Sequence, residues 1–430
     1  MASRPMASFL INDYDTDMKS WNDVAVPQLD SLDDFPALSL TNSATGRKQS
    51  LKEKPLYRMY VCGITPYDAT HLGHAATYLT FDLINRFLRA AGSEVRYVQN
   101  ITDIDDPLLE RAKRDGVDWN DLAHQQIDLF RSDMTHLRVI PPAHYIGAVD
   151  AIPLVTNAIV ELKSKDSIYN VDEDLYFTVH SDKQFGERSH LSEDEMLQTF
   201  SERGGDPNRE GKSHPLDCLV WMSQRPNEPG WPSPFGIGRP GWHIECTAIA
   251  IKYLEPSLEE DALIDIQGGG SDLIFPHHEM CAAQAQVLTG KPLSQTYVHA
   301  GMIGLDGAKM SKSKGNLVFV SKLIEAGREP MAIRWALMQS HYRTDRMWSD
   351  ELLVQSEFEI ARLRQALLQS QVAPTQELIV NIIGYLADDL DTQSVIAALN
   401  TWVDTTNSGH TGGDVVSLTK ALDALLGIRF

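Results

Sequence analysis

Two short segments carry cationic or imidazole side chains of the kind that bind phosphates. His71 and His74 lie together where a predicted strand gives way to a helix, and Lys309, Lys312 and Lys314 lie within six residues of one another. Positioned lysines and histidines stabilise the charge that builds up on phosphates during in-line attack at phosphorus. Either segment alone could be a solvated surface loop, so the prediction of a nucleotide site depends on both.

Cysteine and histidine side chains at three separated positions could bind a metal ion. Cys62 lies in YVCG, Cys246 in GWHIEC and His277 in FPHH, each at a predicted strand end or helix start. Thiolate and imidazole are ligands that zinc prefers, although a buried thiol or packed histidine is the simpler interpretation of any one of them. Cys281, four residues after His277, would share its helix face and is either a fourth ligand or a small neighbour. Cys218, inside an apolar strand, is most simply a core residue.

The elements that must position these residues form an α/β pattern. A strand over 56–61, a helix over 73–91 and a strand over 95–100 make one βαβ unit. A second unit over 216–297 contains strand-like LDCLVW and LIDIQ and helical patterns over 242–253 and 276–288. Ligands of such sheets bind at the carboxyl ends of the strands, so we expect the active site between the two halves.

The rest of the chain divides by composition and periodicity. Residues 1–50 are rich in Asp, Ser, Pro and Asn, which predicts a mobile or loosely packed extension. We predict the following segments: 1–50 extension, 51–145 first half of the catalytic domain, 146–215 connective insertion, 216–300 second half of the catalytic domain, 301–348 lysine-rich loop region, and 349–430 C-terminal helical domain.

Composition limits the class of protein. An apolar fraction of 43% with 23% charged residues is ordinary for a globular chain, and no apolar stretch is long enough to span a bilayer. The first residues lack a secretion signal, and four cysteines are too few for a disulfide framework. We therefore expect a cytoplasmic protein without a membrane partner. The net charge of −21 argues against a broadly basic nucleic-acid surface but does not exclude a local one.

The order HLGH followed by KMSKS resembles the paired signature of class I aminoacyl-tRNA synthetases. The segments GRPGWHIEC and GGGSDLIFPHHE resemble the zinc site of cysteinyl-tRNA synthetases, and the likeness extends from about Leu56 to Arg346. It implies a Rossmann-type (HUP) α/β catalytic domain with an insertion and a C-terminal helical domain. It also implies catalytic roles for His71, His74, Lys309 and Lys312, with the lysines closing over pyrophosphate. These synthetases carry a glutamate ligand at position 281, where this chain has cysteine.

Other segments resemble a sister family. CGITPYDATHLGHAATY replaces the usual synthetase CGPTVYDYIHIGNARTY, and QNITDIDDP, ERGGDP, YVHAGMIG and YLADDLDT are similar to segments of bacterial ligases that join cysteine to glucosaminyl-inositol in mycothiol biosynthesis. The resemblance implies two steps. L-Cysteine and ATP, with Mg²⁺, give cysteinyl adenylate, and the glucosamine amine then attacks its carbonyl to form an amide.

The resemblance also places the adenylate. Trp242 would pack against the substrate and Asp272 would accept its ammonium group. Glu202 to Pro207 would belong to an acceptor-side motif, although a solvated turn explains any single residue there equally well. The zinc ligands would be Cys62, Cys246 and His277. The residues expected around the adenylate are Cys62, Gly63, Ile64, Thr65, Thr77, Asn100, Ile101, Thr102, Trp242, Gly270, Ser271, Asp272 and Ile303.

Two alternatives stay open at this point. A cysteinyl-tRNA synthetase would share the first step, but few lysines or arginines follow Arg364 to dock a tRNA, so no tRNA partner is expected. An inactive paralogue acting as a binding module would be expected to have lost some of these motifs. We expect a monomer. Because the likeness to the ligases begins near Met18, residues 1–17 are expected to be an upstream start or a dispensable extension.

Overall fold

A twisted parallel sheet forms the centre of the molecule in the computed structural model, which describes residues 18–29, 35–68, 70–256, 260–305, 307–310 and 315–430. Its five strands are all parallel and follow the order β11-β10-β3-β4-β5. The chain runs from β3 towards β5 in one direction and from β10 to β11 in the other, so the topology reverses between β3 and β10. The strands are β3 (Leu56–Val61), β4 (Glu94–Ile101), β5 (His144–Gly147), β10 (Ile264–Gly270) and β11 (Ser294–Ala300).

Helices cover both faces of this sheet, which confirms the predicted α/β architecture. Alternate side chains of a strand point to opposite faces, so Tyr57 and Met59 of β3 pack on the face of α1 (Leu72–Ala90), while Tyr60 packs on the face of α4 and α6. Most residues of β4 and β10 are buried because both faces of the sheet are covered, and this includes polar residues such as Asn100 and Gln267. The predicted helix over 242–253 is confirmed with the same bounds as α6 (Trp242–Tyr253).

The insertion forms a separate antiparallel sheet with the order β6-β7-β8-β9. Its strands are β6 (Ile168–Val171), β7 (Asp174–Phe177), β8 (Cys218–Ser223) and β9 (Gly238–Pro240). We expected the strand at LDCLVW to belong to the second half of the catalytic domain, which was wrong. β8 pairs with β7, so the small sheet reaches beyond the predicted boundary at 215. Strand periodicity predicts a strand but not its partner.

The N-terminal residues that the structure describes are packed, contrary to the expectation of a loose extension over 1–50. Trp21 is buried, and its indole N–H donates to the carbonyl of Val139 at 2.8 Å. Strands β1 (Ser39–Asn42) and β2 (Arg47–Ser50) form a hairpin whose Thr41 N–H donates to Asp389 at 2.9 Å. Polar composition was misleading here because a few long-range contacts anchor the segment. Residues 1–17 lie outside the described part of the chain.

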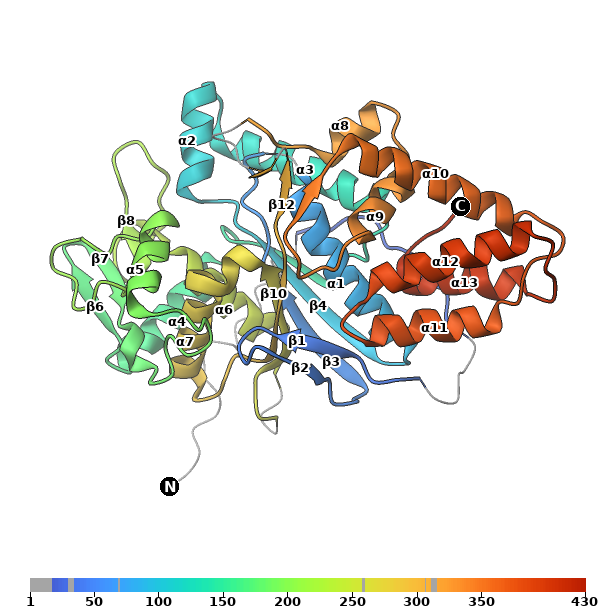
Figure 1. The fold of residues 1–430 in the computed structure, drawn as a ribbon. Helices are drawn as coiled ribbons and strands as arrows, with labels where there is room; N and C mark the ends of the chain where they lie inside the picture. The colour runs from blue at the N-terminus through green and yellow to red at the C-terminus, as the bar shows by residue number, and fades with distance from the viewer. Residues whose placement is uncertain (1–17, 30–34, 69, 257–259, 306, 311–314) are drawn as a thin grey trace.

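The C-terminal region is helical, as predicted, and lies on the opposite side of the central sheet from the insertion (Figure 1). A third sheet, β12 (Ile303–Leu305), β13 (Ala308–Lys309) and β14 (Arg346–Trp348), precedes it. The remaining helices are α2 (Asp106–Asp115), α3 (Trp119–His136), α4 (Ile152–Ser164), α5 (Glu193–Glu202), α7 (Glu279–Thr289), α8 (Val320–Glu325), α9 (Pro330–Met338), α10 (Asp350–Leu367), α11 (Gln376–Ala387), α12 (Thr392–Asn407), α13 (Val415–Leu426) and the short η2 (Val179–Ser181), η3 (Ser271–Leu273) and η4 (Ile274–His278).

A buried ion cluster joins the C-terminal helices to α1. The carboxylate of Asp82 accepts from Arg86 at 2.7 Å and also from Arg334 of α9. Arg86 donates onward to the carbonyl of Asp423, and Arg334 to that of Leu426, at 2.7 and 2.6 Å. Asp82, Arg86 and Arg334 are all fully buried. Because the charges are paired and hydrogen-bonded inside the protein, the cluster fixes α1 relative to α9 and α13.

No helix among the described residues is both long enough and apolar enough to cross a membrane.

Candidate functional site

The site lies at the carboxyl edge of the central sheet, where the topology reverses. The residues after β3 and at the ends of β4 and β10 meet there because the central strands of the sheet are neighbours. Gly63 allows the closest approach. A Cβ at this position would lie 1.7 Å from the carbonyl oxygen of Asn100, and the Gly63 N–H donates to the Asn100 side chain at 2.8 Å. Only glycine fits this contact without moving the backbone.

The predicted adenylate residues of β4 support this loop from below. The side chain of Asn100 is buried and bonds Tyr60, Gly63 and Thr102, at 3.0, 2.8 and 3.2 Å. Ile101 and Thr102 are also buried, and the Thr102 N–H donates to the carbonyl of Ile64 at 3.0 Å. The side chain of Asn100 and the backbone of Thr102 therefore position the loop over 62–65.

The histidines of HLGH lie at the amino end of α1. His71 is the N-cap, and its Nδ1 accepts from the N–H groups of Gly73 and His74 at 3.1 and 3.4 Å. The two imidazoles stack with centroids 3.7 Å apart. Burial and the neighbouring His71 hold the pKa of His74 well below its usual value, so the ring is neutral at pH 7. Within the described structure, Nδ1 of His74 is buried without a hydrogen-bond partner.

The segment that follows the lysine-rich loop contacts this helix, and residues 311–314 of the loop lie outside the described residues. Lys309 belongs to β13, whose backbone pairs with Gly304 of β12, and Lys312 lies outside the described residues. Directly after the loop, the carbonyl of Val318 accepts from the N–H of Leu72 at 2.9 Å, and Phe319 forms a β-bridge with His71. The structure therefore brings the chain around KMSKS next to the amino end of α1.

Cys62, Cys246 and His277 converge, as the sequence predicts. Each is buried, and their sulfur and ring nitrogen atoms all lie within 4.8 Å of one another. Burial opposes thiolate formation at Cys246, but a hydrogen bond from Cys62 and the charge of His277 outweigh it and hold the pKa of Cys246 well below its usual value. Burial likewise disfavours a charged His277, but Cys281 and Cys246 raise its pKa to about 10. Without a metal ion, the proton on His277 balances the thiolate of Cys246; a metal ion bound by the thiolate and the neutral imidazole would replace that proton.

Cys281 lies beside this group rather than in it. Its thiol is directed at the carbonyl of His243 at 3.3 Å and lies 3.8 Å from Nε2 of His277. Among the described residues, the group that meets the 4.8 Å criterion contains three ligands and leaves Cys281 out. A three-ligand site remains our prediction. Cys218 is buried in β8, as expected for a core thiol.

Three further histidines, which we did not single out from the sequence, orient the candidate ligands. Nδ1 of His277 faces Nδ1 of His243 at 2.9 Å. His278 Nε2 lies 3.2 Å from Cys62 Sγ, and His278 Nδ1 lies 2.7 Å from Nε2 of His299, which in turn reaches Ser43 at 2.5 Å. Such partners fix ligand orientation. Histidines inside GWHIEC, FPHH and YVHA were the available signal.

Of the remaining predicted residues, Trp242 contacts the metal group directly. Trp242 stacks on His277 with centroids 4.3 Å apart. The side chain of Asp272 lies against Gly270 at the end of β10. A Cβ atom on Gly270 would lie 2.5 Å from Oδ1 of Asp272 and 3.9 Å from Oγ1 of Thr77. Ser271 is half-buried in the same short segment, and Ile303 is buried at the start of β12. The structure thus brings Trp242, Gly270, Asp272 and Thr77 to one edge.

Three acidic residues, Asp103, Asp105 and Glu245, lie in the segments that follow β4 and begin α6. Asp105 Oδ2 lies 3.4 Å from Oγ1 of Thr65. Burial raises the pKa of Asp103 and of Asp105 to about 6, and burial raises the pKa of Glu245, the neighbour of Cys246, well above its usual value. Of these three carboxyl groups, that of Asp105 lies beside the loop over 62–65, at Thr65.

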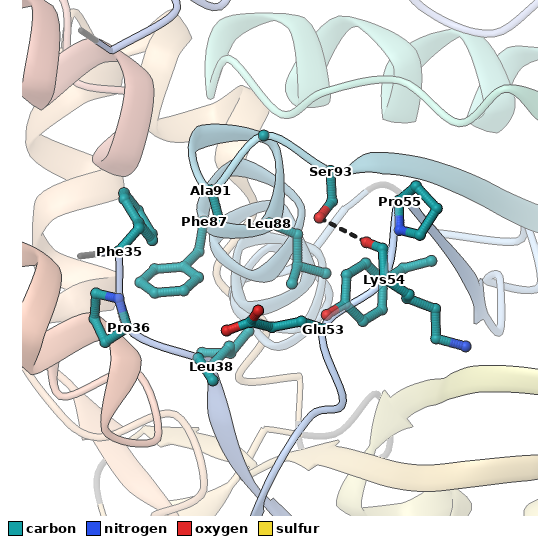
Figure 2. A pocket seen from close by; sticks show the side chains of 13 residues that line it. Phe35, Pro36, Leu38, Glu53, Lys54, Pro55, Phe87, Leu88, Ala91 and Ser93 are labelled. Carbon is teal, nitrogen blue, oxygen red and sulfur yellow. Dashed lines mark hydrogen bonds between the residues drawn. The ribbon is translucent and has the colours of Figure 1, made fainter. Parts of the chain in front are cut away.

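A separate pocket lies elsewhere in the molecule. It has a volume of about 400 Å³ and is lined by the end of α1, including Phe87 and Leu88, and by residues such as Phe35 and Lys54 (Figure 2). Ser93 and Pro55 border it just before β4 and β3 begin, so it lies at the amino edge of the sheet. This is opposite to the edge that carries Cys62 and the histidines, and we assign it no part in the chemistry.

The comparisons with known proteins agree with this geometry. Residues 48–357 match the family of tRNA synthetases class I (C) catalytic domain. Among solved structures, Mycobacterium tuberculosis methionyl-tRNA synthetase in complex with methionyl-adenylate is similar in fold, with a TM-score of 0.61 and 17% identity over 86% of this chain and 90% of that one. A putative arginyl-tRNA synthetase from Campylobacter jejuni is similar with a TM-score of 0.55 and 14% identity, over 88% of this chain and 94% of that one.

Sequence relatives are far more similar. Proteins named L-cysteine:1D-myo-inositol 2-amino-2-deoxy-alpha-D-glucopyranoside ligase are 56% identical in Kribbella flavida, over 86% of this chain and 90% of the relative, and 50% identical in Mycolicibacterium smegmatis, over 96% and 100%. The relative in Nakamurella multipartita is 54% identical, again over 96% and 100%. At this identity over almost the whole length, the chain belongs to the family of L-cysteine:1D-myo-inositol 2-amino-2-deoxy-alpha-D-glucopyranoside ligases.

Proposed function

We propose that this chain is an ATP-dependent ligase that activates L-cysteine as cysteinyl adenylate and transfers it to the amine of glucosaminyl-inositol, forming the amide used in mycothiol biosynthesis. The observation that supports it most is the convergence of Cys62, Cys246 and His277 beside the histidine-capped end of α1. A thiol-binding group next to a phosphate-binding group suits a reaction between cysteine and ATP. Family membership supports the same acceptor.

Zinc is the metal we propose for the three-ligand group, because its donors are two sulfurs and one imidazole nitrogen. When bound, zinc would offer an open coordination position that favours a thiolate over a hydroxyl group. Selection of cysteine over serine would then come from binding alone. Mg²⁺ would accompany ATP.

The side chains of the chain itself would bind and orient the substrates. We propose that His74 donates to the ATP phosphates through its unpartnered ring nitrogen and that Lys309 and Lys312 stabilise the pyrophosphate. Asp272 would accept the cysteine ammonium, and Trp242 would exclude water from the pocket. Backbone groups of the loop over 62–65 and of Gly270 would contact the adenylate.

The acceptor differs between this reaction and tRNA charging. Glucosaminyl-inositol carries an amine, and the carboxyl group of Asp105 beside Thr65 suits a cationic ligand better than a polyanion. The C-terminal helices carry few cationic residues after Arg364, so we propose that tRNA is not a partner. We also propose that the enzyme acts as a cytoplasmic monomer.

Cysteine-dependent exchange of pyrophosphate into ATP tests the activation step. We expect exchange with cysteine, and kcat/KM for serine about 100-fold or more lower, because a hydroxyl group is a poor metal ligand. Metal content is measured on the same preparation. Equal exchange with serine and cysteine would contradict the proposed role of the thiol-binding group.

A further inference from the structure

The ERGGDP segment of the insertion reaches into the amino-acid end of the site through a single side chain. Arg203 follows the last residue of α5, and its Nη1 donates to the main-chain carbonyls of Asp272 and Phe275. Both carbonyls belong to the short segment between β10 and α7. That segment carries Asp272 at one end and His277 at the other, so Arg203 bonds the backbone between an expected substrate ligand and an expected metal ligand.

The receiving carbonyls are not part of a regular helix. Phe275 has extended backbone angles, φ −141° and ψ 139°, inside the helical run that leads to α7. The backbone therefore leaves the helical path there, and its carbonyl needs a partner from outside the run. A guanidinium group supplies several donors in a fixed plane. Arg203 can therefore bond both carbonyls at once and hold the kinked segment in one conformation.

The residues around Arg203 fix its own position. Gly205 packs flat on Phe200, since a Cβ there would lie 2.4 Å from the ring, and the Gly205 N–H donates to the carbonyl of Phe200 at 2.8 Å. Asp206 accepts from the Tyr176 hydroxyl and from Lys212, the latter at 2.9 Å. Gly205 and Asp206 thus fix the chain that follows Arg203 to the insertion, and α5 fixes the chain that precedes it.

We propose that Arg203 is a positioning residue for cysteine binding, which couples the ERGGDP segment to the carboxylate of Asp272. The role in cysteine binding rests on the proposed function, whereas the role of Arg203 in fixing the backbone over 271–278 does not. It gives this segment a role at the amino-acid side of the site. Arg203 does not touch the reacting atoms; it fixes the backbone that presents Asp272 and leads to His277.

The test compares Arg203→Met and Arg203→Lys with the wild-type enzyme in pyrophosphate exchange. For Arg203→Met we expect KM for cysteine to rise about tenfold to hundredfold, as loss of charged hydrogen bonds predicts, with KM for ATP changed by less than about twofold. Arg203→Lys should recover part of the loss because it keeps the charge without the planar fork. Arg114→Met is the control, since Arg114 is exposed and pairs with Asp115 on α2.

Hydrogen–deuterium exchange gives a readout that does not depend on activity. We expect the amides over 271–278 to exchange faster in Arg203→Met, with those of α5 unchanged, and thermal melting shows whether the variant is folded. A folded Arg203→Met enzyme with wild-type KM for cysteine and wild-type protection over 271–278 would overturn the proposal. If the wild-type enzyme shows no cysteine-dependent exchange, the proposed function fails, and the protection of 271–278 alone decides the role of Arg203.

Discussion

Replacing Cys246 with serine is expected to remove the metal and the activity together. Cys246 is buried, and its pKa is held well below the usual value by Cys62 and His277 against the effect of burial, so it is the thiolate of the group. A serine hydroxyl would stay protonated and bind zinc poorly. Losing a residue that only hydrogen-bonds a metal ligand already lowers metal affinity or activity by about 10- to 100-fold. For the loss of a ligand itself, we therefore expect the rate of cysteine-dependent exchange to fall at least about 100-fold.

The measurement pairs metal analysis of purified Cys246→Ser with its exchange rate. Cys218→Ser is the matched control, because Cys218 is also a buried thiol but lies in β8, outside the group. We expect the control to keep its metal. Full activity in Cys246→Ser without bound metal would contradict the metal site, while loss of activity with the metal retained would limit Cys246 to another role.

Removing the carboxylate of Asp82 is expected to have the largest effect on stability. Asp82 is fully buried and pairs with both Arg86 and Arg334, so Asp82→Ala leaves two buried guanidinium groups without the counter-charge that they share. Breaking a buried ion pair from one side costs about 3–5 kcal/mol. The change is read from the denaturation midpoint. Since the cluster fixes α1, the helix that begins with His71, activity should fall as the protein unfolds.

A surface pair provides the control for Asp82. Asp128 is 74% exposed and pairs with Arg131 on α3, so Asp128→Ala should change stability by less than about 1 kcal/mol.

The effect of Asp82 on stability should also depend on pH. Burial would raise its pKa, but Arg86 and Arg334 hold it below the usual value. Its contribution is thus present at neutral pH and is lost only as the pH falls through that lowered pKa, below about 4. Equal losses for both variants at neutral pH would contradict the buried cluster.

The elements that carry the site could be predicted from the sequence because their patterns are local. The strand over 56–61 and the helix over 242–253 have the observed bounds, since each is a continuous run with a clear start. The metal group could also be predicted, because thiolate and imidazole are groups that zinc prefers and the resemblance to cysteinyl-tRNA synthetases marks Cys62, Cys246 and His277 together. Their convergence depends on the fold, since Cys62 follows β3, Cys246 lies in α6 and His277 lies between β10 and α7.

Long-range partners could not be predicted in the same way. The alternation of residues in β8 predicts a strand but not its pairing with β7. The polar residues before β3 likewise do not indicate that Thr41 bonds Asp389 or that Ser43 bonds His299. The role of Arg203 was hidden for the same reason, because its partners are two backbone carbonyls about 70 residues away. Such contacts depend on how the elements pack.

An acceptor assay tests the central claim most directly. Purified enzyme with ATP and cysteine is offered either glucosaminyl-inositol or tRNA, and the amide product and charged tRNA are both measured. The account predicts amide formation, with release of AMP and pyrophosphate, and no charging of tRNA. Charging of tRNA without amide formation would contradict the ligase function and identify the chain as a cysteinyl-tRNA synthetase.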